Sequence, residues 1–352
     1  MLDWANELTL EWDRDRFTRM SLTMTLTTAM TIRIGTRGSR LARWQAEWVA
    51  DRLRGLHPGL NVELVEIKTQ GDRDRNSPLA AIGGVGLFTK EIQRAVRDGS
   101  VDLAVHSLKD LPTQGPAELI LAAVPPREDV ADALIASEHR TFDALPAGAR
   151  VGTSSPRRRA QLLFHRPDLE VVTLRGNVET RLNQALQGRL DAVVLAWAGL
   201  RRLGLEAHVT QRLDPPEFLP AVGQGALGIE CRREDAAVLA LLEPLDDPAT
   251  RRAVRAERTT LAQLEGGCLI PMAAWARDVQ DEDEERIDRP ALALDAAVFD
   301  TDGRSRALIA LRGPRDDPDG LGRRAAAALR EQGAASLLAS APRRPEDSVE
   351  PP

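Results

Sequence analysis

The feature that most constrains the fold is a regular alternation of short apolar segments with amphipathic segments, which begins at Thr31. The segment 101–106 has the length and composition of a buried strand, whereas 39–55 repeats apolar residues at helical spacing. Strands that alternate with helices form largely parallel sheets. The sequence therefore predicts an α/β protein. Strands are expected at 31–35, 62–67, 101–106, 119–124, 133–136, 150–152, 170–174, 190–196, 226–231, 291–299 and 306–311. Helices are expected at 39–55, 89–97, 157–164, 178–187, 248–264 and 320–331.

The length of 352 residues indicates more than one domain, and Pro125-Pro126 and 214–217 are the expected crossing points between units. We expect domain 1 at 31–125 and 226–243, domain 2 at 131–219, and domain 3 at 248–340. We expect 1–30 to be a disordered extension, or to reflect a start site assigned too far upstream. The segment 341–352 is expected to be a disordered tail.

Charge is distributed unevenly along the chain. The formal net charge is −6, yet residues 150–202 contain ten arginines, no lysine and only four acidic residues. A local positive site on a negative protein favours a small polyanionic ligand over nucleic acid. No apolar run is long enough to span a membrane, and the two cysteines and five histidines lack metal-ligand spacing. We therefore expect a cytoplasmic protein without a metal, a membrane partner or a nucleic-acid partner.

Polar clusters follow three of the predicted strands, at 35–39, 105–112 and 152–159. In open α/β sheets, ligands bind beyond the carboxyl ends of the strands, where helix N-termini attract anions. The guanidinium fork of arginine binds carboxylates bidentately. The candidate residues from these clusters and from 174–181 are Arg37, Ser39, Lys109, Asp110, Thr153, Ser155, Arg157, Arg158, Arg175 and Arg181. Ser39 and the Thr153–Ser155 run also fit simple helix caps, and Arg189, Arg201 and Arg202 fit ordinary helix-surface charges.

Two further residues could carry chemistry. Cys268 follows two glycines, which favours an exposed loop where a thiolate can attack an electrophile, although a lone cysteine is more often a packing residue. Cys231 ends an apolar strand and is expected to be a buried, inert thiol. Asp110 beside Lys109 can stabilise a developing positive charge or move a proton, or can be a simple turn pair.

Taken in order along the chain, these motifs resemble those of the porphobilinogen deaminase, or hydroxymethylbilane synthase, family. The resemblance runs from about Thr31 to Ala339, and the motifs are specific in combination rather than singly. They are Arg33-Ile-Gly-Thr-Arg-Gly-Ser, Thr69-Gln-Gly-Asp72, Gly86-Leu-Phe-Thr-Lys-Glu91, Val105-His-Ser-Leu-Lys-Asp-Leu-Pro112, Gly152-Thr-Ser-Ser-Pro-Arg-Arg, Leu174-Arg-Gly-Asn-Val, Ala198-Gly-Leu-Arg-Arg-Leu-Gly, Pro220-Ala-Val-Gly-Gln-Gly-Ala and Gly266-Gly-Cys.

The resemblance implies a transferase of heme and porphyrin biosynthesis. Such an enzyme deaminates four porphobilinogen molecules and joins them head to tail into the linear tetrapyrrole hydroxymethylbilane. It implies two lobes like periplasmic binding proteins plus a smaller α/β C-terminal domain, and a monomer whose partner is its substrate porphobilinogen. It also implies a dipyrromethane cofactor attached by a thioether to Cys268. Asp110 matches the catalytic aspartate, with Lys109 beside it. Substrate or cofactor contacts match Arg37, Ser39, Lys109, Thr153, Ser155, Arg157, Arg158, Arg175, Arg181 and Gln224.

Two departures and two alternatives accompany this interpretation. Val85 replaces a lysine found in many relatives, and the acidic run 278–288 is expected to be a solvated hairpin insertion without effect on chemistry. A non-catalytic, two-lobed receptor for carboxylates would explain the arginines but would need neither Cys268 nor Asp110. A cysteine-dependent acyl transferase would need a histidine in a motif with the thiol, and the sequence shows none.

Overall fold

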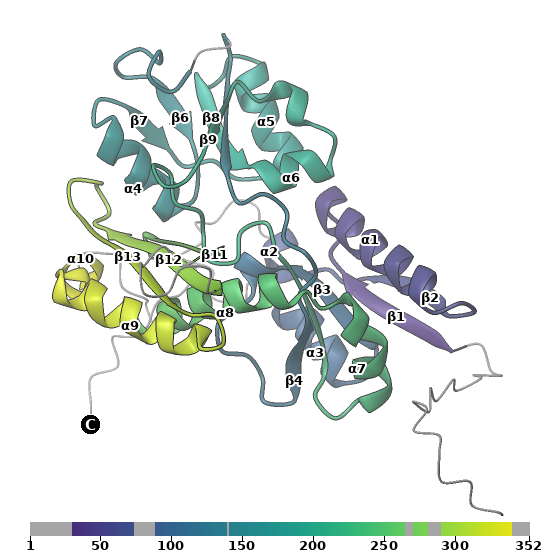
Figure 1. Cartoon of the computed structure of the whole chain (residues 1–352). Helices are drawn as coiled ribbons and strands as arrows, with labels where there is room; N and C mark the ends of the chain where they lie inside the picture. Colours follow the sequence, from purple (N-terminus) through teal and green to yellow (C-terminus); the bar gives the residue numbers. More distant parts are fainter. Residues whose placement is uncertain (1–29, 74–88, 139–140, 265–269, 281–289, 340–352) are drawn as a thin grey trace, which may run out of the picture.

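The structure is a computed structural model and describes residues 30–73, 89–138, 141–264, 270–280 and 290–339. These residues form two five-stranded sheets and one three-stranded sheet, arranged as two lobes and a third domain that contacts both (Figure 1). The sheets are built from segments that are apolar on the faces covered by helices, as the alternation in the sequence predicts. The expected α/β class is confirmed.

Lobe 1 contains the sheet with strand order β2-β1-β3-β10-β4. Its apolar core lies between this sheet and α1, where Ile34, Val49 and Leu53 are fully buried. The strands are β1 (Thr31–Thr36), β2 (Asn61–Glu66), β3 (Leu103–Ser107), β4 (Leu119–Ala123) and β10 (Leu227–Arg232). The helices are α1 (Arg40–Leu56), α2 (Gln70–Arg73), α3 (Lys90–Arg97) and α7 (Ala236–Leu242), with the 3-10 turns η2 (Leu108–Asp110) and η4 (Glu243–Leu245).

Lobe 2 contains the sheet with strand order β7-β6-β8-β5-β9. Its core includes Leu134, Leu162 and Val194. The strands are β5 (Asp132–Ala136), β6 (Arg150–Gly152), β7 (Glu170–Val172), β8 (Ala192–Ala196) and β9 (Gln211–Leu213). The helices are α4 (Pro156–His165), α5 (Val178–Leu186) and α6 (Trp197–Arg202), with the 3-10 turn η3 (Glu206–His208).

The two sheets share one plan, in which the fourth strand in spatial order runs against the other four. This strand is β10 in lobe 1 and β5 in lobe 2. Each is the first strand after the chain crosses between lobes. We call 125–131 the first crossing segment and 220–226 the second crossing segment. The expectation of largely parallel sheets is therefore correct, and the exception in each sheet is the strand that enters from the other lobe.

The third domain is an antiparallel sheet in the order β11-β12-β13, covered by helices (Figure 1). Its elements are α8 (Pro248–Gln263), β11 (Met272–Gln280), β12 (Pro290–Phe299), β13 (Arg306–Pro314), α9 (Pro318–Glu331) and α10 (Ala334–Ala339). The acidic run is not wholly a solvated loop, because Asp278 lies in β11 and pairs with Arg252 at 2.7 Å and Arg315 at 2.6 Å. Residues 281–288 of that run lie outside the described residues.

The third domain packs against both lobes. Phe299 of β12 contacts Phe164 of α4 edge to face, with ring centroids 5.9 Å apart. On the other side, Arg258 of α8 donates to the carbonyl oxygens of Leu111 at 2.9 Å and Pro112 at 2.6 Å, just beyond η2. The domain therefore supports two segments that carry candidate site residues, α4 and η2.

Candidate functional site

In lobe 1 the candidate residues follow two neighbouring parallel strands, β1 and β3, whose carboxyl ends share one edge of the sheet. Arg37 is half-buried in the turn after β1. Ser39 caps α1 by accepting a hydrogen bond from the backbone nitrogen of Ala42 at 3.3 Å. The buried amide of Gln45 donates to Ser107 Oγ at 2.8 Å and so connects α1 to the end of β3. This pair, absent from the sequence prediction, fixes α1 beside the Lys109 turn.

In lobe 2 the end of β6 leads directly into α4. Ser155 caps this helix by accepting from the backbone nitrogen of Arg158 at 3.4 Å, and Thr153 Oγ1 accepts from the backbone nitrogen of Ser155 at 3.2 Å. The cap places Arg157 and Arg158 in the first helical turn. Both are buried, with 3% and 7% exposure. Capping is therefore one role of Ser39 and Ser155, and it positions the arginines that follow.

A carboxylate missing from the sequence prediction lies between these arginines. Asp132, the first residue of β5, is 2% exposed. Its Oδ2 is 2.8 Å from Arg157 Nη2, and its Oδ1 accepts from Arg158 Nη2 at 2.7 Å and from Arg158 Nε at 3.1 Å. The two guanidinium groups hold the pKa of Asp132 below its usual range despite burial. The signal in the sequence is a single acid at the start of the apolar run 131–136.

Gln224 joins this carboxylate to lobe 1. Its Nε2 donates to Asp132 Oδ1 at 2.8 Å and to the carbonyl oxygen of Val130 at 2.8 Å, which connects the second crossing segment to the first. Its Oε1 accepts from Lys109 Nζ and from Arg158 Nη2, both at 3.4 Å. Lys109 thus reaches lobe 2 through Gln224. We call this group of residues the interlobe cluster: Lys109, Asp110, Asp132, Arg157, Arg158, Arg181 and Gln224.

Cations are crowded in the interlobe cluster. Burial, together with the charge of Arg158, lowers the pKa of Lys109 to about 8, whereas Asp110 and Asp132 oppose the shift. Burial also lowers the pKa of Arg181 to about 10, with Arg158 and Arg175 acting in the same direction and Asp110 against them. These mutual effects place Arg175 near the cluster and Asp110 close to both Lys109 and Arg181. A neighbouring anion would relieve this repulsion.

Two buried donors in this region have no hydrogen-bond partner among the described residues. They are Nε of Arg157 and Nε of Arg181. A buried donor without a partner costs free energy that a bound acceptor would recover. A ligand with several carboxylates, such as a dipyrromethane, supplies acceptors of this kind. The residues present therefore fit such a group.

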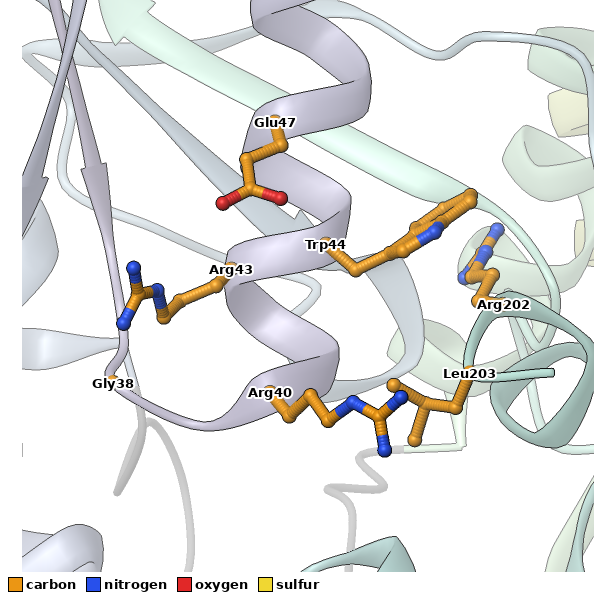
Figure 2. Close-up of a pocket in the computed structure, with 7 residues that line it drawn as sticks. All are labelled: Gly38, Arg40, Arg43, Trp44, Glu47, Arg202 and Leu203. Carbon is orange, nitrogen blue, oxygen red and sulfur yellow. The ribbon is translucent and has the colours of Figure 1, made fainter. Parts of the chain in front are cut away.

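A hollow of about 330 Å³ lies beside the turn at Gly38 and is lined by residues of α1 together with Arg202 and Leu203 at the end of α6 (Figure 2). Arg40, which lines it, pairs with Glu179 of the other lobe at 3.7 Å. Arg202 donates to the carbonyl oxygen of Gly225 at 2.7 Å and lies over the Trp44 ring. Arg202 is therefore not the ordinary surface charge expected from the sequence, because burial lowers its pKa to about 10. Arg189 is exposed, as expected.

The two cysteines differ in what the structure says of them. Cys231 is fully buried in β10, which confirms the expectation of a buried thiol, and burial raises its pKa to about 11, which disfavours the reactive thiolate. Cys268 and Val85 lie outside the described residues. Cys268 falls in the short interval between the end of α8 and the start of β11.

The elements on either side of that interval are fixed to the crossing segments by one buried carboxylate. Glu257 of α8 is fully buried and accepts from Arg127 of the first crossing segment at 2.6 and 3.1 Å. It also accepts from the backbone nitrogens of Gly223 at 2.7 Å and of Ala276 in β11 at 2.9 Å. A single side chain thus connects α8, β11 and both crossing segments.

Among the described residues, no group of three or more histidine, cysteine, aspartate or glutamate side chains is placed to hold a metal ion. No helix in the same part of the chain is long and apolar enough to cross a membrane.

The fold and the interlobe cluster together define a two-lobed α/β protein with a third domain and a cluster of buried cations whose donors fit a carboxylate-rich ligand. The chain belongs to the porphobilinogen deaminase family. Residues 32–240 match the family's "Porphobilinogen deaminase, dipyromethane cofactor binding domain", and residues 251–331 match its "C-terminal domain". The chain is thus a transferase of tetrapyrrole synthesis, with the hydroxymethylbilane synthase activity and the dipyrromethane cofactor of this family.

Individual relatives cover nearly the whole chain. It is 50% identical over 309 residues to the porphobilinogen deaminase of Syntrophotalea carbinolica, which covers 88% of this chain and 95% of the relative. It is 52% identical over 310 residues to that of Xanthomonas campestris, covering 88% and 99%. Among solved structures, an arginine-specific periplasmic binding protein of Salmonella typhimurium aligns with 62% of this chain and 92% of its own. Its identity is 13% and its TM-score is 0.36, too distant to add to the account of the fold.

Proposed function

We propose that the interlobe cluster is the active site at which four porphobilinogen molecules are deaminated and condensed. The observation that supports this most strongly is the combination of buried guanidinium donors without partners and the carboxylate of Asp110 in one place. A growing chain of pyrroles carries acetate and propionate groups, so a site for it needs several cations. It also needs an anion beside them, because loss of ammonia leaves positive charge on a pyrrole.

The binding role falls to residues that reach the cluster from both lobes. Arg157 and Arg181 offer buried Nε donors to ligand carboxylates, and Lys109 adds a positive charge that it retains below about pH 8. Helix caps hold several of these groups in place. The full set proposed to contact substrate or cofactor is Arg37, Ser39, Lys109, Thr153, Ser155, Arg157, Arg158, Arg175, Arg181 and Gln224.

The catalytic role falls to Asp110, assisted by Lys109. Asp110 ends η2, a turn braced from behind by Arg258 of the third domain through the carbonyl oxygens of Leu111 and Pro112. A carboxylate held in this way can stabilise positive charge on the reacting pyrrole and can accept or return a proton. Lys109 beside it, with its lowered pKa, can hold or release a proton near neutral pH.

We further propose that Cys268 holds the dipyrromethane cofactor through a thioether. The cofactor, when bound, primes the growing chain with its terminal pyrrole. Glu257 ties both α8 and β11, the elements on either side of Cys268, to the crossing segments that carry Gln224. The attachment point is thus connected to the interlobe cluster through described contacts.

We also propose that the protein acts as a cytoplasmic monomer of three domains. Domain 1 comprises 31–125 and 226–243, domain 2 comprises 131–219, and domain 3 comprises 248–340. Every described strand of the three sheets falls within these limits. The strands β4, β5 and β10 lie next to the crossing segments that separate the domains. Size-exclusion chromatography with light scattering measures the molar mass in solution and so tests whether the protein is a monomer.

The function is tested by intact mass and turnover of porphobilinogen. The purified protein is expected to carry one dipyrromethane, with peptide mapping placing it on Cys268 and not on Cys231. Cys268→Ser should lack the adduct and nearly all activity, because a serine hydroxyl is a far weaker nucleophile than a thiolate. Cys231→Ser is the matched control and should keep the adduct. An unmodified Cys268 peptide in active protein would refute the assignment.

A further inference from the structure

Asp132 determines which way the two buried arginines present their donors. All three side-chain nitrogens of Arg158 face protein acceptors: Nε and Nη2 contact Asp132, and Nη1 contacts the carbonyl oxygen of Val194 at 3.0 Å. Arg157 contacts Asp132 through Nη2 and the carbonyl oxygen of Leu219 through Nη1, at 2.6 Å, which leaves its Nε without a partner. The carboxylate thus holds Arg158 inward and fixes Arg157 with one donor available.

Asp132 also offsets the repulsion among cations from both lobes. Four charged residues influence Lys109 electrostatically: Arg157 and Arg158 disfavour its protonated form, and Asp110 and Asp132 favour it. Asp132 is nearly inaccessible to water, so its charge is weakly screened. Without it, Lys109, Arg157 and Arg158 would face one another without the carboxylate that now contacts both arginines, and an ion pair broken in this way leaves buried charge uncompensated.

The position of Asp132 in the chain adds a mechanical link. It is the first residue after the first crossing segment, and it accepts a hydrogen bond from Gln224 of the second crossing segment. Gln224 in turn contacts Lys109 of lobe 1. A ligand that binds both Arg157 and Lys109 would therefore contact residues that are hydrogen-bonded, directly or through Asp132 and Gln224, to the crossing segments that join the lobes.

We propose that Asp132 is a positioning residue for the reaction: a buried carboxylate that holds Arg158 inward, fixes Arg157 with its Nε available to the ligand and, through Gln224, holds both arginines against Lys109 across the two lobes. It does not itself contact substrate. This role deepens the proposed function of the cluster and rests on it. The consequence is that removing the charge of Asp132 alters the protonation of Lys109 as well as the affinity for carboxylates.

The first test measures the protonation of Lys109 directly. The chain has three lysines, Lys68, Lys90 and Lys109, so ¹³C-dimethylated protein gives one lysine signal for each in an NMR pH titration. The signal of Lys109 should titrate near pH 8 in the native protein. In Asp132→Asn its midpoint should fall by about one unit, because a nearby opposite charge is lost. Lys68 and Lys90 should not move.

A matched control separates this effect from the loss of any acid–arginine pair. Asp295 of β12 is largely buried and pairs with Arg277 at 2.6 Å, in the third domain. Asp295→Asn should leave the Lys109 titration unchanged. An unchanged Lys109 midpoint in Asp132→Asn, or an equal shift in Asp295→Asn, would overturn the proposal.

The second test uses steady-state kinetics with porphobilinogen and a variant that retains the charge. Asp132→Asn should raise KM about tenfold or more and should shift the alkaline limb of the pH–rate profile to lower pH together with Lys109. Asp132→Glu keeps the charge but displaces it, so it should preserve the Lys109 midpoint while raising KM about tenfold.

Each outcome decides the question. If Asp132→Asn fails to fold, Asp132→Glu still tests positioning, and native KM and kcat in that variant would overturn the proposal. If the native protein shows no turnover of porphobilinogen, the proposed function fails, whereas the NMR titration still reports whether Asp132 controls Lys109. The two failures are therefore distinguishable.

Discussion

Burial separates the arginines of 150–202 into groups with different chemistry. Arg157 and Arg158 are buried and Arg181 is half-buried, all three beside other charges, whereas Arg189, just beyond α5, is exposed. A buried guanidinium has little contact with water, so a ligand carboxylate that reaches it interacts with it strongly. An exposed guanidinium must give up its bound water to bind a carboxylate, so the net gain in binding free energy is small.

Arg181→Lys should therefore impair substrate binding, because lysine has no counterpart of the Nε donor that lacks a partner. Loss of one charge-assisted hydrogen bond costs roughly 1.5–3 kcal/mol, or about 10- to 150-fold in affinity. The measurement is KM for porphobilinogen together with the fraction of protein that carries the cofactor. Arg189→Lys is the control and should behave as the native protein, and equal effects of the two variants would contradict the assignment.

Asp110→Asn should fold normally and lose most of its turnover, with the loss in kcat rather than in KM. Asparagine has the same shape but carries no charge to stabilise a cationic pyrrole. Asp110→Glu should retain more activity than Asp110→Asn, because it keeps the charge at a shifted position. Steady-state kinetics beside a thermal melt checks both variants. Turnover of Asp110→Asn within a few-fold of native would show that Asp110 is only a turn residue.

At the scale of elements, the two crossing segments are the parts on which the site most depends. They carry Gln224 and Arg127, and they deliver Asp132 to the start of β5. The second crossing segment is packed closely against the first at Gly225, whose φ of +85° is in the left-handed region. A Cβ at this position would overlap the carbonyl oxygen of Glu128. Glycine is therefore required there by backbone conformation and by space.

Gly225→Ala should destabilise the protein by more than the cost of the left-handed conformation, which is about 1–2 kcal/mol. The overlap with Glu128 adds about 1–3 kcal/mol, because backbone must move to relieve it. Gly188→Ala is the matched control, since its φ is +65° and nothing lies within 4 Å of the added carbon. Urea unfolding of both variants makes the comparison, and equal losses would show that the close approach of the crossing segments is unimportant.

At the scale of the molecule, the third domain is joined to the lobes at the point where the crossing segments meet. Glu257 contacts Arg127, Gly223 and Ala276, and so links three parts of the chain through one carboxylate. The ion pair between Arg127 and Glu257 is shielded from solvent, because the Arg127 side chain is 9% exposed and the Glu257 side chain is 0% exposed. The third domain is therefore joined to the crossing segments by a buried ion pair.

Glu257→Gln should lower the free energy of unfolding by about 3–5 kcal/mol, because it leaves the guanidinium of Arg127 buried without a counter-ion. Glu179→Gln is the control: it removes a partly exposed contact of 3.7 Å with Arg40, and its effect should be within about 0.5 kcal/mol. Thermal and urea unfolding measure the difference. A loss in Glu257→Gln no larger than in the control would refute the central role of this carboxylate.

The sequence by itself determined the α/β class, most helices and strands, the capping residues Ser39 and Ser155, and membership of the family. These depend on local periodicity, on caps within a few residues, and on motifs that are contiguous in the chain. Strand β11 escaped prediction because alanines dominate its first half and alanine has low strand propensity.

Only the tertiary structure decided which charges meet. Asp132 contacts Arg158 across 26 positions, and Lys109 contacts Gln224 across 115, so no local pattern indicates either pair. The same holds for Arg202, which is half-buried and donates to the carbonyl oxygen of Gly225. The physical reason is that desolvation and charge pairing depend on what surrounds a side chain, and the neighbours here come from both lobes through the two crossing segments.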